Sequence, residues 1–428
     1  MNAAPIAGQN PSALDTAAAA ARLVELTDRN REIHEHDCLN LNPATNTMNP
    51  AAEALLAAGL GNRPSLGHPG DKYEMGLEAI EQIELLCADA ARQVFRADHA
   101  EIRIGSGALA NLYTFMAAAQ PGDAVIVPPA TIGGHVTHNR AGAAGLYGLD
   151  IHEAPIDPER YSVDVAALAE MAERVRPKVI SIGGSLNLCH HPVRELREVA
   201  DSVGAVLLFD AAHLSGPIAG GAWPDPLAEG AHVMTMSTYK SLAGPPAGLL
   251  VTNDADLAER VDAIAFPGLT ANFDVANSAA LAMTLLDWIE HGEAHATAMV
   301  ETASALAAAM IDQQIPVHVA ADGPTVSHAF AVDCSESTRL GGGGHGEAKW
   351  LRLSNLLTCA IGLPHDPAAG LRIGTNELVR WGMGVDDMDT VARLFAEAWY
   401  ASEPMLVKLA AQKVTEFRSQ FDQLHFIR

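Results

Sequence analysis

The sequence has few lysines for its length. Its 428 residues include 27 basic side chains, and arginine supplies most of them. Only six are lysines, namely Lys72, Lys178, Lys240, Lys349, Lys408 and Lys413. Arginine stays protonated, whereas a lysine amine can lose its proton and attack a carbonyl group. In such a chain, a lysine beside a glycine-rich loop is a candidate for chemistry that arginine cannot perform.

Other features are also scarce. The five cysteines form no CxxC pair and are odd in number, which predicts a reduced, cytoplasmic protein. No apolar run approaches about 18 residues, so we expect no membrane partner. The alanine-rich N-terminus lacks a basic region and predicts an arm and a helix rather than a signal peptide. The formal charge of −25 favours solubility and disfavours binding to nucleic acid.

Helical and strand-like segments alternate from about residue 80 to residue 250. Helical spacing at 77–95, 106–120, 163–175 and 193–204 is interleaved with short apolar runs at 100–106, 123–129, 177–185, 205–213 and 231–238. This alternation predicts an α/β fold with a mostly parallel sheet covered by helices. In such sheets, reactive groups gather at the carboxyl ends of the strands.

The remainder of the chain predicts a second, smaller domain. We expect a helix at 275–291, a long connecting helix at 292–314, a strand at 325–334 and a helix at 386–401. The glycine-rich stretch 341–347 reads as a mobile loop that carries a solvated His345. The expected domains are an N-terminal arm and helix (1–40), a large domain (41–291) and a C-terminal domain (292–428).

Four features fall at the ends of predicted strands. The segment GSGALAN (105–111) offers Ser106, Gly107 and Ala108 at the start of a helix, where backbone N–H groups favour a phosphate. Asp210 ends a strand and could hold a protonated ring nitrogen or cap a helix. His135 follows two glycines and is either a stacking ring or a surface histidine.

Lys240 is the fourth feature, because it follows a strand and precedes a Gly/Pro-rich loop. Together the four features match pyridoxal 5′-phosphate (PLP), which needs a lysine Schiff base and an acidic partner for its ring nitrogen. The alternative for Lys240 is a lysine that merely caps a strand end.

At this point the sequence resembles the serine hydroxymethyltransferase family, which has the aspartate-aminotransferase-like PLP fold. The resemblance runs from about residue 40 to residue 400 through GHPGDKYEMG, GSGALANLYTFMAAAQPGD, GGHVTH, LREVADSVGAVLLFDAAHLSG, STYKSLAGPPAG, AFPG and GLRIGTNELVRWGM. It implies a large domain with a seven-stranded sheet, a smaller α/β domain, and a homodimer or tetramer with composite active sites. The substrates would be amino acids and aldehydes.

The resemblance also implies roles for individual residues. For the cofactor it implies Lys240, Asp210, His135, Ser106, Gly107, Ala108, Ser185, His213, Thr238 and Gly268. For the substrate it implies Arg372, Thr45 and Tyr73, and it adds Glu74 and Tyr239 to the catalytic group. Arg372 suits a carboxylate because its planar fork binds bidentately, although a structural ion pair is the alternative.

The chain departs from the family around the substrate. The family's proton-shuttling Glu is Leu66 here, a Tyr is Pro64, and a second active-site Tyr is Glu74. The His before the lysine is Tyr239, and an Arg-Gly pair is Pro246-Ala247. A leucine cannot transfer a proton.

These departures predict a folate-independent aldolase or transaldolase that cleaves or forms the Cα–Cβ bond of β-hydroxy-α-amino acids through a glycine quinonoid. The first alternative is a serine or α-methylserine hydroxymethyltransferase that uses tetrahydrofolate, with Glu74 as a substitute acid. The second is a PLP-dependent transaminase, racemase or lyase, since the fold alone does not decide the reaction. A non-catalytic PLP-fold protein is disfavoured by the intact Lys240, Asp210 and Arg372.

Overall fold

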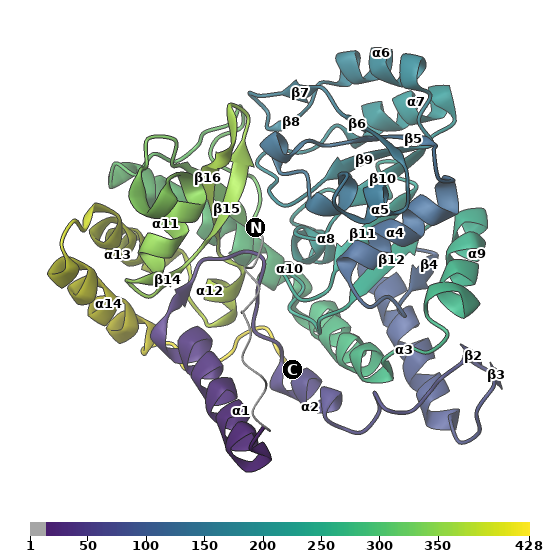
Figure 1. Cartoon of the computed structure of the whole chain (residues 1–428), viewed down its shortest axis with the longest axis horizontal. Helices are drawn as coiled ribbons and strands as arrows, with labels where there is room; N and C mark the ends of the chain where they lie inside the picture. Colours follow the sequence, from purple (N-terminus) through teal and green to yellow (C-terminus); the bar gives the residue numbers. More distant parts are fainter. Residues whose placement is uncertain (1–13) are drawn as a thin grey trace.

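The computed structural model describes residues 14–428, so the first 13 residues of the predicted arm lie outside it. Two lobes lie on either side of the long helix α10 (Val275–Asp312), as Figure 1 shows. Most of α10 is lined by buried side chains, and it contacts α2 (Pro50–Leu56), α3 (Glu78–Phe95) and α13 (Met388–Tyr400). Helix α10 is therefore the spine that holds the two lobes together.

The large lobe is built on the seven-stranded sheet that the sequence predicts. Its strand order is β4 (His99–Glu101), β12 (Gly248–Thr252), β11 (Val233–Ser237), β10 (Val206–Asp210), β9 (Val179–Gly183), β5 (Ala124–Val127) and β6 (Asp150–Glu153). Only β12 pairs antiparallel with its neighbours, so the sheet is mostly parallel. The carboxyl ends of the parallel strands consequently meet along one edge.

Apolar side chains alternate between the two faces of this sheet. On β10, Leu208 packs in one core cluster, whereas Leu207 and Phe209 pack in the other. Helices α4 (Gly107–Ala118) and α9 (Ala255–Ala263) contact strands of the sheet, as do α3 and α7 (Val193–Val203). Nearly continuous apolar strands of this kind are typical of a sheet that is buried on both faces.

The small lobe contains the antiparallel sheet β13 (Ala329–Asp333), β16 (Asp366–Gly374) and β15 (Cys359–Leu363). Helices α11 (Gly343–Arg352), α13 and α14 (Pro404–Arg418) lie in this lobe (Figure 1). Strand β1 (Leu39–Asn40) pairs in parallel with β14 (Leu356–Leu357). The segment that follows β1 is thereby held beside the C-terminal part of the chain.

Two helical expectations in the C-terminal half were wrong. The helices expected at 275–291 and 292–314 are the single helix α10, which passes through Gly292 without a break. A Cβ added at Gly220 would lie 2.1 Å from the carbonyl oxygen of Gly292, so this helix and the end of α8 (Ser215–Ala219) are in close contact. The domain boundary placed at residue 291 falls inside α10, and the division into domains stays a prediction.

The glycine-rich stretch 341–347 is not a loop, because α11 begins at Gly343. A Cβ at Gly344 would lie 1.7 Å from the carbonyl oxygen of Gly370, and one at Gly346 would lie 2.0 Å from that of Arg339. These glycines therefore serve close packing of a helix against β16 and its surroundings. His345 is exposed, as expected, and it lines a surface cavity.

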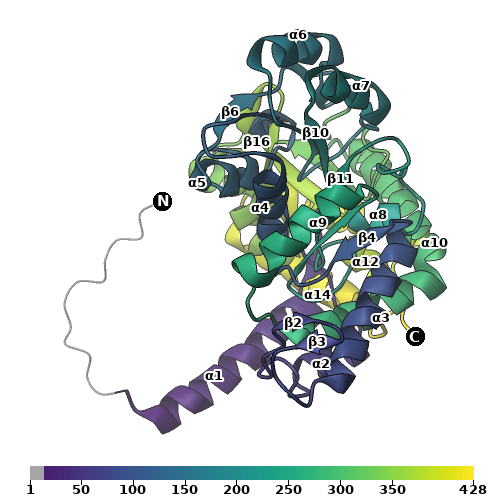
Figure 2. The same cartoon turned by 90° about the vertical axis from the view of Figure 1, so that its right-hand side faces the viewer.

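By length and composition, α10 could cross a membrane, but half of its apolar window is buried inside the structure. A buried central helix of a folded domain passes the same test. Helix α1 (Thr16–Arg31) differs from α10, since it has no buried residue and projects from the body in Figure 2. Its exposed apolar side chains include Leu23 and Val24.

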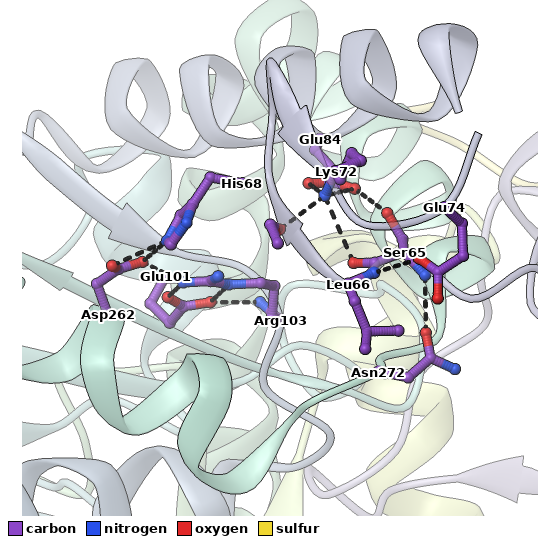
Figure 3. A network of polar contacts seen from close by, with 11 residues as sticks. Ser65, Leu66, His68, Lys72, Glu74, Glu84, Glu101, Arg103, Asp262 and Asn272 are labelled. Carbon is purple, nitrogen blue, oxygen red and sulfur yellow. Dashed lines mark hydrogen bonds and ion pairs between the residues drawn. The ribbon is translucent and has the colours of Figure 1, made fainter. Parts of the chain in front are cut away.

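A short hairpin, β2 (Gly67–His68) and β3 (Asp71–Lys72), is fixed by a buried ion pair. Lys72 Nζ lies 2.8 Å from both carboxylate oxygens of Glu84 on α3, and it also donates to the carbonyl of Gly67 (Figure 3). Only 3% of the Lys72 side chain and 5% of the Glu84 side chain are exposed. The hairpin is thus tied rigidly to α3.

We expect Lys72→Met to lower the free energy of unfolding by about 3–5 kcal/mol, because it leaves the Glu84 charge buried without its partner. Adding Glu84→Gln should restore much of this loss. Denaturant unfolding at a fixed protein concentration measures both effects. Arg22→Met, which removes one partner of an exposed pair with Glu25, is the control and should change little. A loss below about 1 kcal/mol for Lys72→Met would contradict the assignment.

Candidate active site

The predicted site residues converge on the carboxyl edge of the large sheet. Asp210 is the last residue of β10, and Lys240 follows β11 in a turn. Ser185 follows β9, and Ser106 caps α4. Arg372 comes from β16 of the small lobe, and its Nη1 donates a hydrogen bond to the carbonyl of Ser185. The site therefore lies where the two lobes meet.

Asp210 is a buried carboxylate held by three donors. Its Oδ2 lies 2.8 Å from Nε2 of His138 and 3.0 Å from Nδ2 of Asn111, and its Oδ1 accepts from the amide of Ala212. Burial would raise the pKa of Asp210, but the hydrogen bond and charge of His138 hold this pKa below its usual value. The side chain is thus an anion at neutral pH, as a partner for a protonated ring nitrogen must be.

Lys240 is buried beside this carboxylate. Burial lowers the pKa of its amine to about 8, with Asp210 acting to raise it and Arg372 to lower it. No hydrogen bond or ion pair engages Nζ among residues 14–428. A lysine whose pKa lies near neutrality is partly deprotonated at neutral pH. The free amine is the form that attacks an aldehyde.

The start of α4 forms a backbone cradle. Ser106 is its N-cap, and the hydroxyl accepts from the amide of Leu109 at 3.2 Å. A Cβ at Gly107 would lie 2.3 Å from Oγ of Ser237, so only glycine fits between α4 and the end of β11. Ala108 is exposed in the first turn, where amides have no partner within the helix. An anion at this end would also meet the positive end of the helix dipole.

Two histidines face the same region. Burial lowers the pKa of His135 to about 4, so its half-buried ring is neutral at pH 7. His135 Nδ1 lies 3.0 Å from Oγ1 of Thr137, which orients the ring. His213 is buried, its pKa is lowered well below the usual value by burial and by the charge of Lys240, and its Nδ1 has no hydrogen-bond partner within residues 14–428.

Arg372 is a buried cation without a carboxylate partner among residues 14–428. Its Nη1 contacts the carbonyl of Ser185 and lies 3.1 Å from Nε2 of His213. Its Nε and Nη2 lie 3.3 and 3.1 Å from Sγ of Cys359. The structural ion pair that was the alternative role for Arg372 is not formed within this part of the chain. An unpaired buried guanidinium suits an incoming carboxylate.

These residues fit PLP. The orphaned Nδ1 of His213, the partially deprotonated Lys240, the buried Asp210 and the cradle at Gly107 supply, respectively, a polar contact, an amine, an anion and a phosphate-binding helix start. Such a set is what PLP requires of a protein.

The residues flanking Lys240 have distinct surroundings. Thr238 uses its hydroxyl within the loop, donating to the carbonyl of Ala247 at 3.0 Å. Tyr239 is 38% exposed, and its ring centroid lies 5.9 Å from Nζ of Lys240. The cofactor role predicted for Thr238 and the catalytic role predicted for Tyr239 stay predictions.

Several predicted site residues have no hydrogen bond or ion pair to Lys240, Asp210 or Arg372 within the described chain, among them Tyr73, Glu74 and Gly268. Tyr73 is 82% exposed, and Gly268 is exposed in the segment Ile264–Leu269. Glu74 turns back instead: its Oε2 accepts from the amide of Leu66 at 3.2 Å (Figure 3). A carboxylate thus lies next to the residue that replaces the family's Glu.

Thr45, predicted to bind substrate, contacts a buried acid. Its hydroxyl lies 3.2 Å from Oε2 of Glu377, which also accepts from Nδ2 of Asn40 at 2.7 Å. Burial raises the pKa of Glu377 to about 8. The contact joins the N-terminal segment to α12 (Asn376–Arg380), close to Arg372 in sequence. A substrate role for Thr45 stays a prediction.

Sequence reasoning missed two residues that hold Asp210. His138 is the last residue of the GGHVTH segment, and its Nδ1 lies 3.2 Å from Oγ of Ser181. Asn111 closes the GSGALAN segment, and its Oδ1 accepts from Thr235 at 2.6 Å. Both residues belong to segments that the resemblance had already singled out. The second histidine of GGHVTH, three residues after His135, was the signal that could have identified His138.

We expect Glu377→Gln to stabilise the protein at pH 8 but not at pH 5. The folded state keeps the proton of Glu377 up to about pH 8, whereas the unfolded chain loses it near its ordinary value of 4.5. Between these values the folded state binds more protons, so stability falls as pH rises. The gain at pH 8 should be roughly 2–4 kcal/mol, measured by denaturant unfolding. An equal effect at both pH values would contradict a neutral Glu377, and exposed Glu25→Gln is the control.

Comparisons with known proteins find relatives over nearly the whole chain. The family profile described as serine hydroxymethyltransferase matches residues 17–395. A protein of a Ralstonia species named alpha-methylserine aldolase is 53% identical over 95% of this chain and 92% of its own length. One of the same name from Variovorax paradoxus is 57% identical over 97% of this chain and 93% of its own.

A more distant relative, a serine hydroxymethyltransferase of Methanopyrus kandleri, is 37% identical over 91% of each chain. These matches confirm the predictions of the family, of its PLP-dependent fold and of an aldolase-type enzyme that acts on a Cα–Cβ bond. The roles of individual site residues stay predictions. By family profile and by relatives over nearly its whole length, this chain belongs to the serine hydroxymethyltransferase family.

Proposed function

We propose that this protein is a PLP-dependent aldolase that cleaves α-methylserine into alanine and formaldehyde without tetrahydrofolate. One observation supports this proposal most directly. The chain keeps the residues expected to bind PLP and the substrate carboxylate, but it has Leu66 where the family has a proton-transferring Glu. The relatives named alpha-methylserine aldolase support the choice of substrate. Transaldolation, in which a second aldehyde takes the place of the one released, is a variant of the same reaction.

The residues divide the work by their chemistry. Arg372 binds the substrate carboxylate, and Lys240 would hold PLP through its amine until the substrate amine takes its place. Asp210, an anion held by His138 and Asn111, keeps a proton on the ring nitrogen of the cofactor. When bound, PLP draws electrons from a bond at Cα. The amides at Gly107 and Ala108 would bind its phosphate, and the neutral ring of His135 would stack on its ring.

α-Methylserine restricts the chemistry because its Cα carries no hydrogen. Transamination and racemisation both begin by removing an α-proton, so this substrate cannot enter either reaction. Cleavage of Cα–Cβ requires a base to take the β-hydroxyl proton, after which formaldehyde departs and Cα is protonated to give alanine. This argument favours the aldolase over the transaminase, racemase and lyase alternatives.

The base for the hydroxyl proton distinguishes the two remaining hypotheses. Leu66 cannot transfer a proton. The carboxylate that contacts it is Glu74, which accepts a hydrogen bond from the Leu66 amide. Aldol cleavage needs one base for one hydroxyl proton. Condensation of formaldehyde with folate needs additional proton transfers, for which the usual Glu is absent. The folate-dependent reaction is the alternative if Glu74 substitutes for it.

We expect the holoenzyme to release formaldehyde from α-methyl-L-serine at the same rate with and without tetrahydrofolate. Leu66→Glu should introduce or raise folate-dependent conversion of serine to glycine, whereas Leu66→Gln should not, because an amide carries no transferable proton. Formaldehyde and amino-acid products are measured in parallel. Efficient folate-dependent turnover of serine by the unmodified protein would overturn the proposal and favour Glu74 as the substitute acid.

We expect Lys240→Ala to remove both the borohydride-reducible chromophore and turnover, because no other lysine is proposed to hold PLP. Lys178→Ala, which changes an exposed lysine, is the matched control and should keep both. Absorption spectra and peptide mapping after borohydride reduction give the answer. Label at a lysine other than Lys240 would refute the assignment.

We propose, further, that the protein is a homodimer with composite sites. Tyr73 and Met75 are more than four-fifths exposed, and α1 buries none of its residues. Apolar groups displayed in this way favour a protein partner, and a second copy is the commonest one. Tyr73, Glu74 and Gly268 would then serve the site of the partner subunit.

Mixing Lys240→Ala with Glu74→Gln protein should test this arrangement. Half of randomly mixed dimers are mixed, and each contains one intact site, so we expect about one quarter of unmodified activity. Sedimentation of the unmodified protein measures its assembly. A fully active monomer, or mixed samples as inactive as either parent, would contradict the composite site.

A cytoplasmic location is also proposed, since all five cysteines are unpaired. Free thiols persist in reducing compartments. Fractionation of cells that express the full chain, with an antibody against it, tests the location. Recovery in an oxidising compartment would contradict it.

A further inference from the structure

A thiol covers one edge of the Arg372 guanidinium. Cys359 and Arg372 are directly opposed in the antiparallel pair β15–β16, and Sγ of Cys359 lies 3.3 Å from Nε and 3.1 Å from Nη2. The Nε and Nη2 hydrogens point the same way, which makes this the edge that grips a carboxylate side-on. Cys359 therefore occupies the place that a bidentate ligand would take.

The other acceptors around Arg372 are stronger. Nη1 contacts the carbonyl of Ser185 and Nε2 of His213. With the two contacts to Cys359, four of the five guanidinium N–H groups are engaged. A bidentate carboxylate needs two parallel N–H groups, so at least one acceptor must give way. A thiol sulfur is a weak acceptor, and displacing it costs the least.

The thiol is itself oriented from the N-terminal segment. Cys359 Sγ lies 3.0 Å from Oδ1 of Asn42, and that oxygen also accepts from the amide of Ala44 at 3.0 Å. The S–H group therefore donates to Asn42, and the sulfur lone pairs face the guanidinium. Cys359 and Asn42 also line a cavity of about 490 Å³, which gives the displaced thiol room to move.

We propose that Cys359 is a positioning residue that holds the Arg372 guanidinium in the empty site and yields its side-on edge to the substrate carboxylate. This inference rests on the proposed function, in which Arg372 binds that carboxylate. It follows that the acceptor strength at position 359 sets the affinity for amino acids. A weak acceptor orients the cation without competing for it, whereas an anion there would close the site.

The test compares Cys359→Asp, Cys359→Ser and Cys359→Ala in the holoenzyme. Titration with α-methyl-L-serine is followed by the cofactor absorption, and 2-aminopropan-1-ol, which lacks the carboxylate, is the second probe. We expect Cys359→Asp to weaken the amino acid at least about 100-fold while the amino alcohol changes less than about twofold, since only the carboxylate competes for Arg372. Ala360→Asp, which adds the same charge at the next, exposed position of β15, is the matched control and should change neither.

The milder variants separate positioning from a purely structural role. Cys359→Ala should raise KM about 3–10-fold with kcat nearly unchanged, because the guanidinium loses the two contacts to sulfur that orient it. Cys359→Ser keeps a neutral acceptor and should restore KM toward that of the unmodified protein. In the cofactor-free protein, Cys359→Asp should melt at a higher temperature than Cys359→Asn, because aspartate pairs with Arg372. That difference should vanish in an Arg372→Ala background.

A double-mutant cycle keeps this inference distinct from the proposed function. If Arg372→Ala leaves amino-acid affinity unchanged, the carboxylate role of Arg372 fails, and the inference fails with it. If Arg372→Ala weakens binding but Cys359→Asp does not, only the role of Cys359 is overturned. Equal loss of the amino acid and the amino alcohol in Cys359→Asp also overturns it. The inference is supported only if Cys359→Asp causes no further loss of amino-acid affinity in the Arg372→Ala background.

Discussion

The candidate active site depends on an imbalance of buried charge. Two buried cationic side chains, Lys240 and Arg372, lie around one buried carboxylate, Asp210, in a chain whose formal net charge is −25. A buried charge is costly unless it is paired. The site relieves this cost in part by lowering the pKa of Lys240 to about 8, and an anionic phosphate and an anionic carboxylate would complement the rest. The same imbalance would favour ligands that carry negative groups.

Each charge is held by a different part of the fold. Asp210 stands at the end of β10, where Asn111 from α4 and His138 reach it, and Lys240 follows the neighbouring strand. Arg372 comes from β16 of the small lobe and reaches Ser185 across the boundary. The packing of both lobes on α10 is therefore a condition for assembling the site (Figure 1). A shift of one lobe against the other would therefore displace Arg372, at the substrate end of the site, more than the cofactor residues of the large lobe.

Sequence patterns were sufficient for the large sheet and for the positions of Asp210 and Lys240 along it. Parallel strands alternate with helices at regular spacing, so Asp210 and Lys240 could be placed at strand ends before any coordinates. The patterns failed where glycine has a packing role: the stretch 341–347 read as a loop, yet Gly344 and Gly346 begin a helix pressed against other backbone. Contacts between strands of the small lobe, such as Cys359 with Arg372, depend on strand register that composition does not reveal.

Because of the departures from the family, the main functional question is whether the Cα–Cβ bond of the substrate is cleaved without folate. Leu66 and Glu74 are hydrogen-bonded to each other at the hairpin, and neither is proposed to hold PLP, so the cofactor chemistry can persist while proton transfer changes. The most direct test incubates the holoenzyme with α-methylserine labelled with ¹³C at the hydroxymethyl carbon, in D₂O and without folate. Carbon NMR should show the label only in hydrated formaldehyde, with equimolar alanine that carries deuterium at Cα. Label retained in the amino acid, or cleavage that begins only when tetrahydrofolate is added, would contradict the account.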